Sequence, residues 1–190
     1  MLNKRTPVSL LLAIACIALA LIPESAQQLL AYDRHAIFAG EIWRLWTGHL
    51  VHFSHTHALI DGIVLYAMSS LAEREFGSRS LLGALALAAL VISLVLLAFV
   101  PSLLEYRGSS GIAVLVAVMA VTAVWHDERN HAIVMLVAAA YTLKTLVDSL
   151  SLAPTSTVLP LGVSVAWQAH VCGAIAGAAA VCFLGRRRAL

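Results

Sequence analysis

Long apolar runs separated by short polar connections are the feature that most limits what this sequence can fold into. A helix needs about 20 apolar residues to cross a bilayer. The apolar runs cover roughly residues 8–22, 57–72, 80–100, 110–125, 131–150 and 161–184. Of the 190 residues, 61% are hydrophobic and 12% are charged, whereas soluble domains are about 45–50% apolar and about 25% charged. The sequence therefore predicts an all-α membrane protein with six transmembrane helices in one domain, residues 1–190.

The distribution of lysine and arginine predicts the orientation, because these residues are enriched in cytoplasmic loops. With both termini inside, eight of the twelve basic residues lie in the cytoplasm. Arg34, Arg44 and Arg107 lie outside, and Lys144 lies within a span. We therefore expect cytoplasmic N- and C-termini. The alternative is a cleaved signal peptide with "NKR" as its basic end and "PESAQ" as its cleavage site. Cleavage would leave five spans and would contradict the charges of the later loops.

Two segments differ from simple spans and turns. The connection 23–56 is long and carries "EIWRLW", and Trp43, Arg44 and Trp46 suit the outer headgroup layer. We expect it to be an interfacial loop. The fourth run, 110–125, is too short to fill the bilayer. The preceding "RGSS" should therefore descend into the membrane as non-helical backbone, which is tolerated only where protein or a water-filled cavity surrounds it.

A serine and a histidine are expected at one depth in the membrane. Ser110 lies 15 residues before Trp125, where the fourth span ends, and His170 lies 15 residues before Gly185, where the sixth span ends. At 1.5 Å per residue, both lie ~22 Å from the cytoplasmic face, or roughly 8 Å below the outer edge of a ~30 Å core. Ionisable residues at such depths are candidates for function. Ser110 and His170 can therefore meet if their helices pack together.

Small residues near both positions favour that packing. Gly173 and Gly177 are four residues apart, a spacing that permits close approach of helices, and Gly111 and Ala113 follow Ser110. Unpaired N–H groups and the positive dipole end of the fourth helix would then face a cavity and could stabilise an oxyanion. A serine at a helix start is also a routine N-cap. The matching depth of His170 favours a site.

The same residues resemble the motifs of one family, the rhomboid intramembrane serine proteases. "RGSSG" resembles the nucleophile motif GxSG, with Ser110 as the serine, and "AHVCGAIAG" resembles AHxxGxxxG, with His170 as the base. "GEIWRLWTGHLVHFSHTHALID" resembles the first loop and the start of the second helix, with the pattern HxxxxHxxxN at His52, His57 and Asp61. The resemblance covers residues 40–180 in the family's order.

This resemblance implies a rhomboid-type six-helix bundle and a Ser–His dyad that hydrolyses peptide bonds of membrane-anchored proteins. His170 would take the proton of Ser110, and the oxyanion would be held by the Ser110 N–H, His57 and residue 61. The remaining candidates for oxyanion or substrate binding are Gly108, Ser109, Gly111, Lys144 and Asp148. We expect no cofactor and no metal. The net charge of +2 gives no indication of nucleic-acid binding.

The compact chain and its first loop also resemble the rhombosortase branch. By resemblance, such enzymes process bacterial surface or secreted proteins that end in a Gly-Gly motif, an apolar helix and a basic tail. The resemblance implies partners with that tail and a multi-pass protein of the bacterial inner membrane whose active site faces the periplasm.

Two positions depart from the family pattern. Residue 61 is Asp where the family usually has Asn, and an ionised carboxylate would repel an oxyanion. Asp61 must therefore either be protonated and donate a hydrogen bond to the oxyanion, or turn away from it to bind His57 or a backbone N–H. Val114 stands where the family often has a tyrosine that supports the histidine ring. Packing of Trp167 or Gln168 would have to replace that tyrosine.

Other polar residues have alternative interpretations. His52, His55, His57 and Asp61 could bind zinc, although we favour interfacial hydrogen bonding. Lys144 and Asp148 have the i,i+4 spacing of an ion pair, which is either a snorkelling structural pair or part of the recognition of the substrate's small-residue end. Three further residues are expected to be structural, bonding to carbonyls or a neighbouring helix: Ser93, Thr122 and Tyr141.

Two non-protease functions remain as alternatives. A catalytically inactive relative could bind or escort membrane proteins, but such proteins typically lack the serine or the histidine. A carrier or haem-binding bundle would need histidines that face each other across helices, and only His170 lies well inside a helix.

Overall fold

The computed structural model describes residues 7–150 and 165–188, and helices make up almost all of its regular structure. The long helices are α1 (Val8–Ala20), α5 (His55–Phe76), α6 (Ser78–Phe99), α7 (Ser110–Val124), α8 (His131–Ser149) and α9 (Trp167–Arg188). The short elements are α2 (Glu24–Leu30), β1 (Tyr32–Asp33), α3 (Arg34–Phe38), α4 (Arg44–Thr47), β2 (Glu105–Tyr106) and the 3₁₀ helix η1 (Glu128–Asn130).

These helices confirm the prediction of a helical membrane protein. Within the described ranges, three helical segments are long and apolar enough to cross a bilayer: Ser78–Phe99, Glu128–Ser149 and Trp167–Gly185. The helices α1 and α7 are apolar but shorter. Each predicted apolar run contains a helix, although residues 161–164 of the sixth run lie outside the described residues. The count of six spans and their orientation stay predictions.

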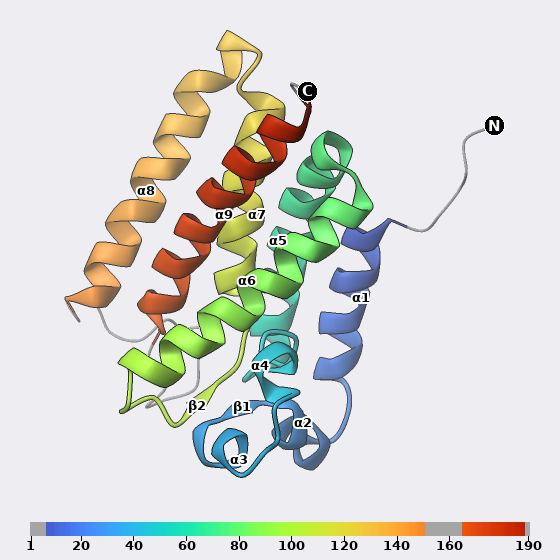
Figure 1. Cartoon of the computed structure of the whole chain (residues 1–190), viewed down its shortest axis with the longest axis vertical. Coiled ribbons are helices and arrows are strands. Elements are labelled where there is room, and N and C mark those ends of the chain that lie inside the picture. Colours follow the sequence, from blue (N-terminus) through green and yellow to red (C-terminus); the bar gives the residue numbers. More distant parts are fainter. Residues whose placement is uncertain (1–6, 151–164, 189–190) are drawn as a thin grey trace.

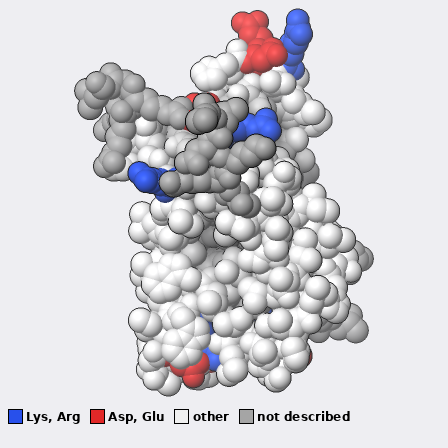
Figure 2. Space-filling model, turned by 90° about the vertical axis from the view of Figure 1, so that its right-hand side faces the viewer, with Lys and Arg blue, Asp and Glu red and all other residues white. Residues whose placement is uncertain are grey.

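The arrangement of the helices separates two ends of the molecule. The helix α1 begins and α9 ends at one end of the bundle, whereas the short elements between α1 and α5 gather at the opposite end (Figure 1). On the face shown in Figure 2, the charged side chains lie toward the two ends, with a broad uncharged band between them. Such a band suits the hydrocarbon core of a membrane.

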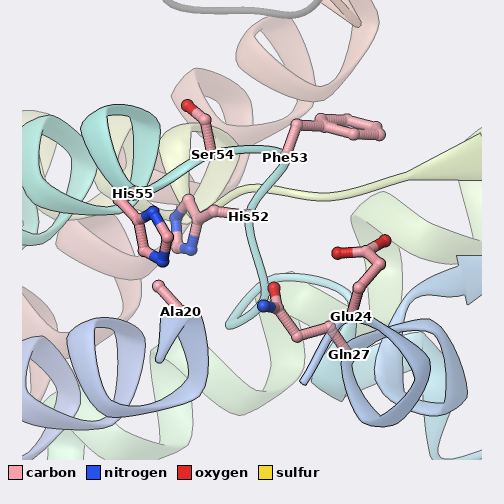
Figure 3. A pocket seen from close by; sticks show the side chains of 7 residues that line it. All are labelled: Ala20, Glu24, Gln27, His52, Phe53, Ser54 and His55. Carbon is pink, nitrogen blue, oxygen red and sulfur yellow. The ribbon is translucent and has the colours of Figure 1, made fainter. Parts of the chain in front are cut away.

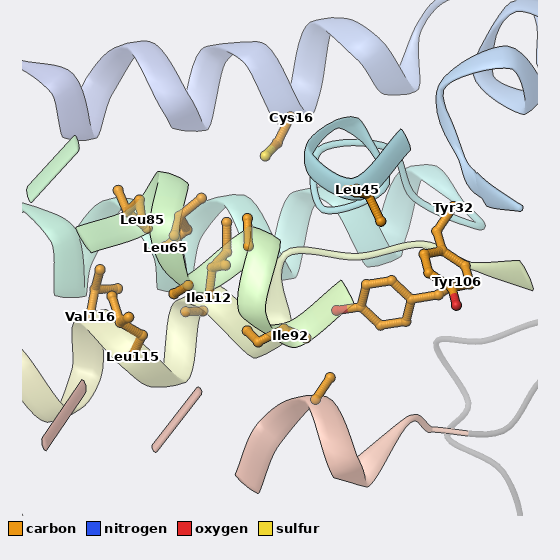
Figure 4. Close-up of a cluster of buried hydrophobic side chains, with 14 of the residues drawn as sticks. Cys16, Tyr32, Leu45, Leu65, Leu85, Ile92, Tyr106, Ile112, Leu115 and Val116 are labelled. Atoms are coloured by element: carbon orange, nitrogen blue, oxygen red, sulfur yellow. The ribbon is translucent and has the colours of Figure 1, made fainter. Parts of the chain in front are cut away.

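The helix α7 lies at the centre of the bundle, where it packs between α5 and α9. Most of its residues between Gly111 and Ala120 are buried. Figure 4 shows Ile112, Leu115 and Val116 of α7 in the apolar cluster, together with side chains from neighbouring helices. The bundle therefore carries Ser110, the first residue of α7, on its most enclosed helix.

The first loop is a compact folded unit rather than a loose connection. β1 pairs antiparallel with β2, which aligns Tyr32 with Tyr106. Trp43 and Trp46 are exposed, as expected for the headgroup layer, but Arg44 is buried. Its guanidinium donates to the carbonyls of Gln28 at 2.6 Å and Ala31 at 2.7 Å. The donors of Arg44 thus satisfy backbone acceptors inside the loop, and its place at the level of the headgroup layer stays a prediction.

A buried histidine attaches this loop to α6. The Nε2 of His49 lies 3.1 Å from the Ala89 carbonyl oxygen and 3.0 Å from the Ser93 Oγ. Ser93 in turn donates to the Leu45 carbonyl at 2.8 Å. Burial of the ring lowers the pKa of His49 from 6.5 to about 4. Ser93 is thus structural as predicted, and so is Thr122, which donates to the Met119 carbonyl.

Candidate active site

The side chains of Ser110 and His170 are in direct contact. The His170 Nε2 lies 3.0 Å from the Ser110 Oγ, and the imidazole is buried. Ser110 begins α7, and His170 lies in the first turn of α9. The two residues are 60 positions apart in the sequence, so only the packing of α7 against α9 brings them together.

Glycines at the α7–α9 contact permit this approach. A Cβ atom added to Gly173 would overlap the carbonyl oxygen of Gly111. A Cβ added to Gly177 would come within 2.8 Å of the Leu115 carbonyl oxygen, and one on Gly111 within 3.2 Å of the Ala169 carbonyl oxygen. The backbones of the two helices are therefore nearly touching, as the spacing of Gly173 and Gly177 predicts.

The backbone before α7 descends through Gly108. This residue has φ +132°, a conformation that favours glycine because it has no Cβ. Its N–H donates to the Gly48 carbonyl at 3.1 Å, and its own carbonyl accepts from the Tyr106 hydroxyl at 2.8 Å. The Gly108 N–H is thus occupied and cannot hold an oxyanion. Gly108 instead supplies space, since a Cβ there would lie 3.0 Å from the His57 Cε1.

Ser109, not Ser110, occupies the N-cap position of α7, and its side chain makes no capping hydrogen bond. Its hydroxyl is fully buried and lies 3.4 Å from both the His52 Nε2 and the Asp61 Oδ2. Ser109 therefore lies behind the dyad and cannot contact a substrate with its side chain. The N-cap interpretation of Ser110 is wrong, because the Ser110 hydroxyl pairs with His170.

Asp61 lies between two histidines. Its Oδ2 is 3.4 Å from the Nε2 of His52 and 3.4 Å from the Nε2 of His57. Asp61 and His57 are buried, and Gly108 packs against both of them. An ionised carboxylate only accepts hydrogen bonds, so this geometry suits an Asp61 that holds its histidine neighbours. Of the two alternatives for Asp61, the contact with His57 is the one present.

The N–H of Ser109 points at His52, with its nitrogen 3.3 Å from the Nε2. The Nε2 must then accept, which leaves the Ser109 hydroxyl and His57 as the donors to Asp61. The rings of His52 and His57 meet edge to face, with centroids 5.0 Å apart. This buried group links the start of α5 to the backbone that delivers Ser110.

Of the histidines considered as zinc ligands, His52 and His57 contact Asp61. His55 lines a pocket with Ala20, Glu24, Gln27, His52, Phe53 and Ser54 (Figure 3). In the described part of the chain, no three His, Cys, Asp or Glu side chains are arranged to hold a metal ion. The described residues therefore give the zinc interpretation no support.

Lys144 and Asp148 form the predicted i,i+4 ion pair on α8. The Lys144 Nζ lies 2.5 Å from the Asp148 Oδ2, and the lysine side chain is exposed while the aspartate is largely covered. The pair belongs to the helix that packs beside α9.

Tyr141, which the sequence predicts to be structural, lies beside the dyad. The ring of Tyr141, on α8, lies 5.7 Å from the His170 ring between centroids, at a tilt of 53°. Trp167 or Gln168 was expected to support the histidine instead. Nothing in the sequence places Tyr141 beside His170, because the contact depends on how α8 and α9 rotate about their axes.

The comparison with protein families agrees with this geometry. The rhomboid domain model matches residues 39–187, from the end of α3 to the end of α9. That span includes α4 of the first loop, Asp61 with its two histidine neighbours, Ser110 and His170. No curated protein sequence matches the chain significantly. Since the matched region covers well over half of the sequence, the chain belongs to the rhomboid family, a family of intramembrane serine proteases.

Proposed function

We propose that this protein is an active intramembrane serine endopeptidase, with Ser110 as the nucleophile and His170 as the general base. The observation that carries the proposal is the 3.0 Å contact between the Ser110 Oγ and the His170 Nε2. A serine hydroxyl becomes an effective nucleophile when an adjacent base accepts its proton. Both groups lie on rigid helices, which favours catalysis because the reacting atoms are held in place.

The reaction follows from these two side chains. The His170 Nε2 takes the Ser110 proton as the Oγ attacks the scissile carbonyl carbon, and the imidazolium then protonates the leaving amine. A water molecule, deprotonated by His170, attacks the acyl-enzyme and releases the second product. The first N–H groups of α7 have no intrahelical acceptor. Those of Ser110 and Gly111 are the backbone donors that we assign to the oxyanion.

We propose that His57, which packs against Gly108, forms one side of the oxyanion site. Asp61 then orients the His57 ring. The support is that Asp61 lies within hydrogen-bonding distance of His57 and can accept from it, whereas a carboxylate facing the oxyanion directly would repel it. In this assignment, Asp61 acts through His57 and does not touch the substrate.

The substrates that we propose are membrane-anchored proteins with a C-terminal Gly-Gly motif, an apolar helix and a basic tail, as in the rhombosortase branch. The support is the resemblance of the first loop to that branch. Lys144 and Asp148 would help to recognise the small-residue end of the substrate. The protein would then reside in the bacterial inner membrane, with both termini cytoplasmic and the active site toward the periplasm.

A catalytically inactive member of the family that binds membrane proteins is the competing function. It requires neither Ser110 nor His170 to be reactive. The presence of both residues, hydrogen bonded to each other, favours the protease.

A fluorophosphonate probe tests the proposal on the purified full-length protein. We expect labelling of the wild type and loss of labelling in Ser110→Ala and His170→Ala. Ser70→Ala is the matched control, because the Ser70 hydroxyl donates to its own helix at Tyr66 and lies far along α5 from the dyad. A folded wild type that does not react would support the inactive binder.

Co-expression with Gly-Gly-tailed substrates forms the second arm of the same experiment. We expect cleavage by the wild type, none by Ser110→Ala, and impaired cleavage by Lys144→Met with unchanged probe labelling. Labelling without cleavage of any such substrate would leave the protease in place and exclude the rhombosortase specificity.

A further inference from the structure

The base of the dyad has an unpaired nitrogen. The His170 Nε2 faces Ser110, and the His170 Nδ1 is buried with no hydrogen-bond partner among the described residues. When Nε2 accepts the serine proton, the neutral ring carries its other hydrogen on Nδ1. A buried N–H without an acceptor is costly, and it leaves the tautomer and the ring orientation without support.

A second unpaired polar atom lies beside it. The hydroxyl of Tyr141 is also buried without a hydrogen-bond partner in the described part of the chain. The two rings are neighbours, with centroids 5.7 Å apart and tilted by 53°. A phenol oxygen can accept from an imidazole N–H, and one ordered water can bridge two such groups when they do not touch.

The helix that carries Tyr141 makes this contact unusual. None of the residues of α8 (His131–Ser149) is fully buried, so the helix has few side chains that face the interior. The hydroxyl of Tyr141 is nevertheless shielded from solvent. On α7, the residue one turn after Ser110 is Val114, which has no polar atom to offer and lies against Gly173. Among the described residues, Tyr141 is the aromatic residue whose ring contacts the His170 ring.

We propose that Tyr141 is a positioning residue for the general base: its ring packs against His170, and its hydroxyl accepts the Nδ1 hydrogen directly or through one water. This contact would hold the tautomer in which Nε2 faces Ser110. The inference rests on the proposed protease function, and it makes α8 part of the catalytic arrangement without contact between Tyr141 and the substrate.

The test separates the ring from the hydroxyl of Tyr141. Tyr141→Phe keeps the ring and removes the hydroxyl, and Tyr141→Leu removes both. Tyr66→Leu is the matched control, since Tyr66 is an exposed tyrosine on α5. For each full-length variant in detergent, the reaction with the fluorophosphonate probe is measured over a range of probe concentrations. This measurement separates the maximal inactivation rate from the probe concentration at half-maximal rate.

We expect the maximal rate to fall about tenfold in Tyr141→Phe and about a hundredfold in Tyr141→Leu, as general-base catalysis is worth ~10²–10⁴-fold in rate. The half-maximal concentration should stay within about twofold of wild type, because Tyr141 does not touch the probe. Tyr66→Leu should behave as wild type.

Several results would overturn the inference. A wild-type maximal rate in Tyr141→Phe rules out the hydroxyl contact, and this variant decides the question even if Tyr141→Leu does not fold. A rise in the half-maximal concentration at constant maximal rate would show that Tyr141 binds the probe rather than His170. If the wild type itself does not react, the protease function fails, which is a separate outcome from a normal rate in the variants.

Discussion

At residue 61 a carboxylate occupies a position next to the dyad where a negative charge is a disadvantage. The structure shows how the chain accommodates it. The Asp61 Oδ2 lies 3.4 Å from each of three groups, the His52 Nε2, the His57 Nε2 and the Ser109 hydroxyl. His57 and the Ser109 hydroxyl can each offer a hydrogen to the carboxylate, so its charge is directed into the protein and away from an incoming carbonyl.

This arrangement predicts a difference between two substitutions of Asp61. Asp61→Asn keeps an acceptor for His57 and should change the maximal probe-labelling rate by less than about tenfold. Asp61→Leu leaves His57 without its partner and should lower the rate by ~10²-fold or more, the scale of losing one oxyanion-site group. Labelling kinetics of both variants, compared at equal folded protein, check the prediction. Equal losses in the two variants would mean that the charge of Asp61 is itself required.

At the scale of elements, the pairing of α7 with α9 decides whether a site exists. The chain reaches the start of α7 through Gly108, whose positive φ favours glycine. The helix α9 approaches α7 so closely that side chains at Gly173 and Gly177 would collide with α7 backbone or side-chain atoms. Ser110 and His170 meet because this interface is made of small residues.

A larger residue at Gly173 should therefore separate the dyad. Gly173→Val forces a side chain into the Gly111 carbonyl, and overpacking of this kind destabilises a protein by about 1–3 kcal/mol. We expect probe labelling to fall by at least ~10²-fold, with a lower melting temperature. Gly185→Val is the control on the same helix, since nothing lies within 4 Å of a Cβ there. Normal labelling of a folded Gly173→Val protein would contradict this account.

At the scale of the whole molecule, the first loop is attached to the bundle by buried polar contacts. Arg44 ties the loop together through the Gln28 and Ala31 carbonyls. His49 attaches it to α6 through Ala89 and Ser93. The loop covers the end of the bundle at which α7 begins (Figure 1). These buried polar contacts therefore contribute to the stability of the entire fold.

The buried His49 predicts acid sensitivity. Its pKa is about 4 in the folded protein against 6.5 ordinarily, so between these values the unfolded chain binds the extra proton. The free energy of unfolding should fall as pH decreases through this window, by at most about 3 kcal/mol from this residue. Unfolding in mild detergent at pH 7 and pH 4.5 measures the loss, which should be smaller in His49→Gln. The same loss in both proteins would assign the acid sensitivity to other groups.

Sequence alone predicted the membrane class, the positions of the long helices and a common level for Ser110 and His170. Hydropathy reports which segments cross the bilayer, and the fixed rise of a helix converts residue counts into depth, so two distant side chains could be placed at one level. The glycine spacing then indicated which helices approach each other. The family resemblance added the roles of these residues and the importance of position 61.

Tertiary structure decided the direction in which each side chain points. Membrane depth and residue spacing along the sequence do not give this direction. It placed Ser109 behind the dyad and buried Arg44 inside the first loop. It also turned Asp61 toward two histidines and brought Tyr141 beside His170. These contacts depend on the rotation of each helix about its axis and on the path of the loop, which result from packing many side chains at once. A one-dimensional pattern gives the level of a residue in the membrane, but not the neighbour that it faces.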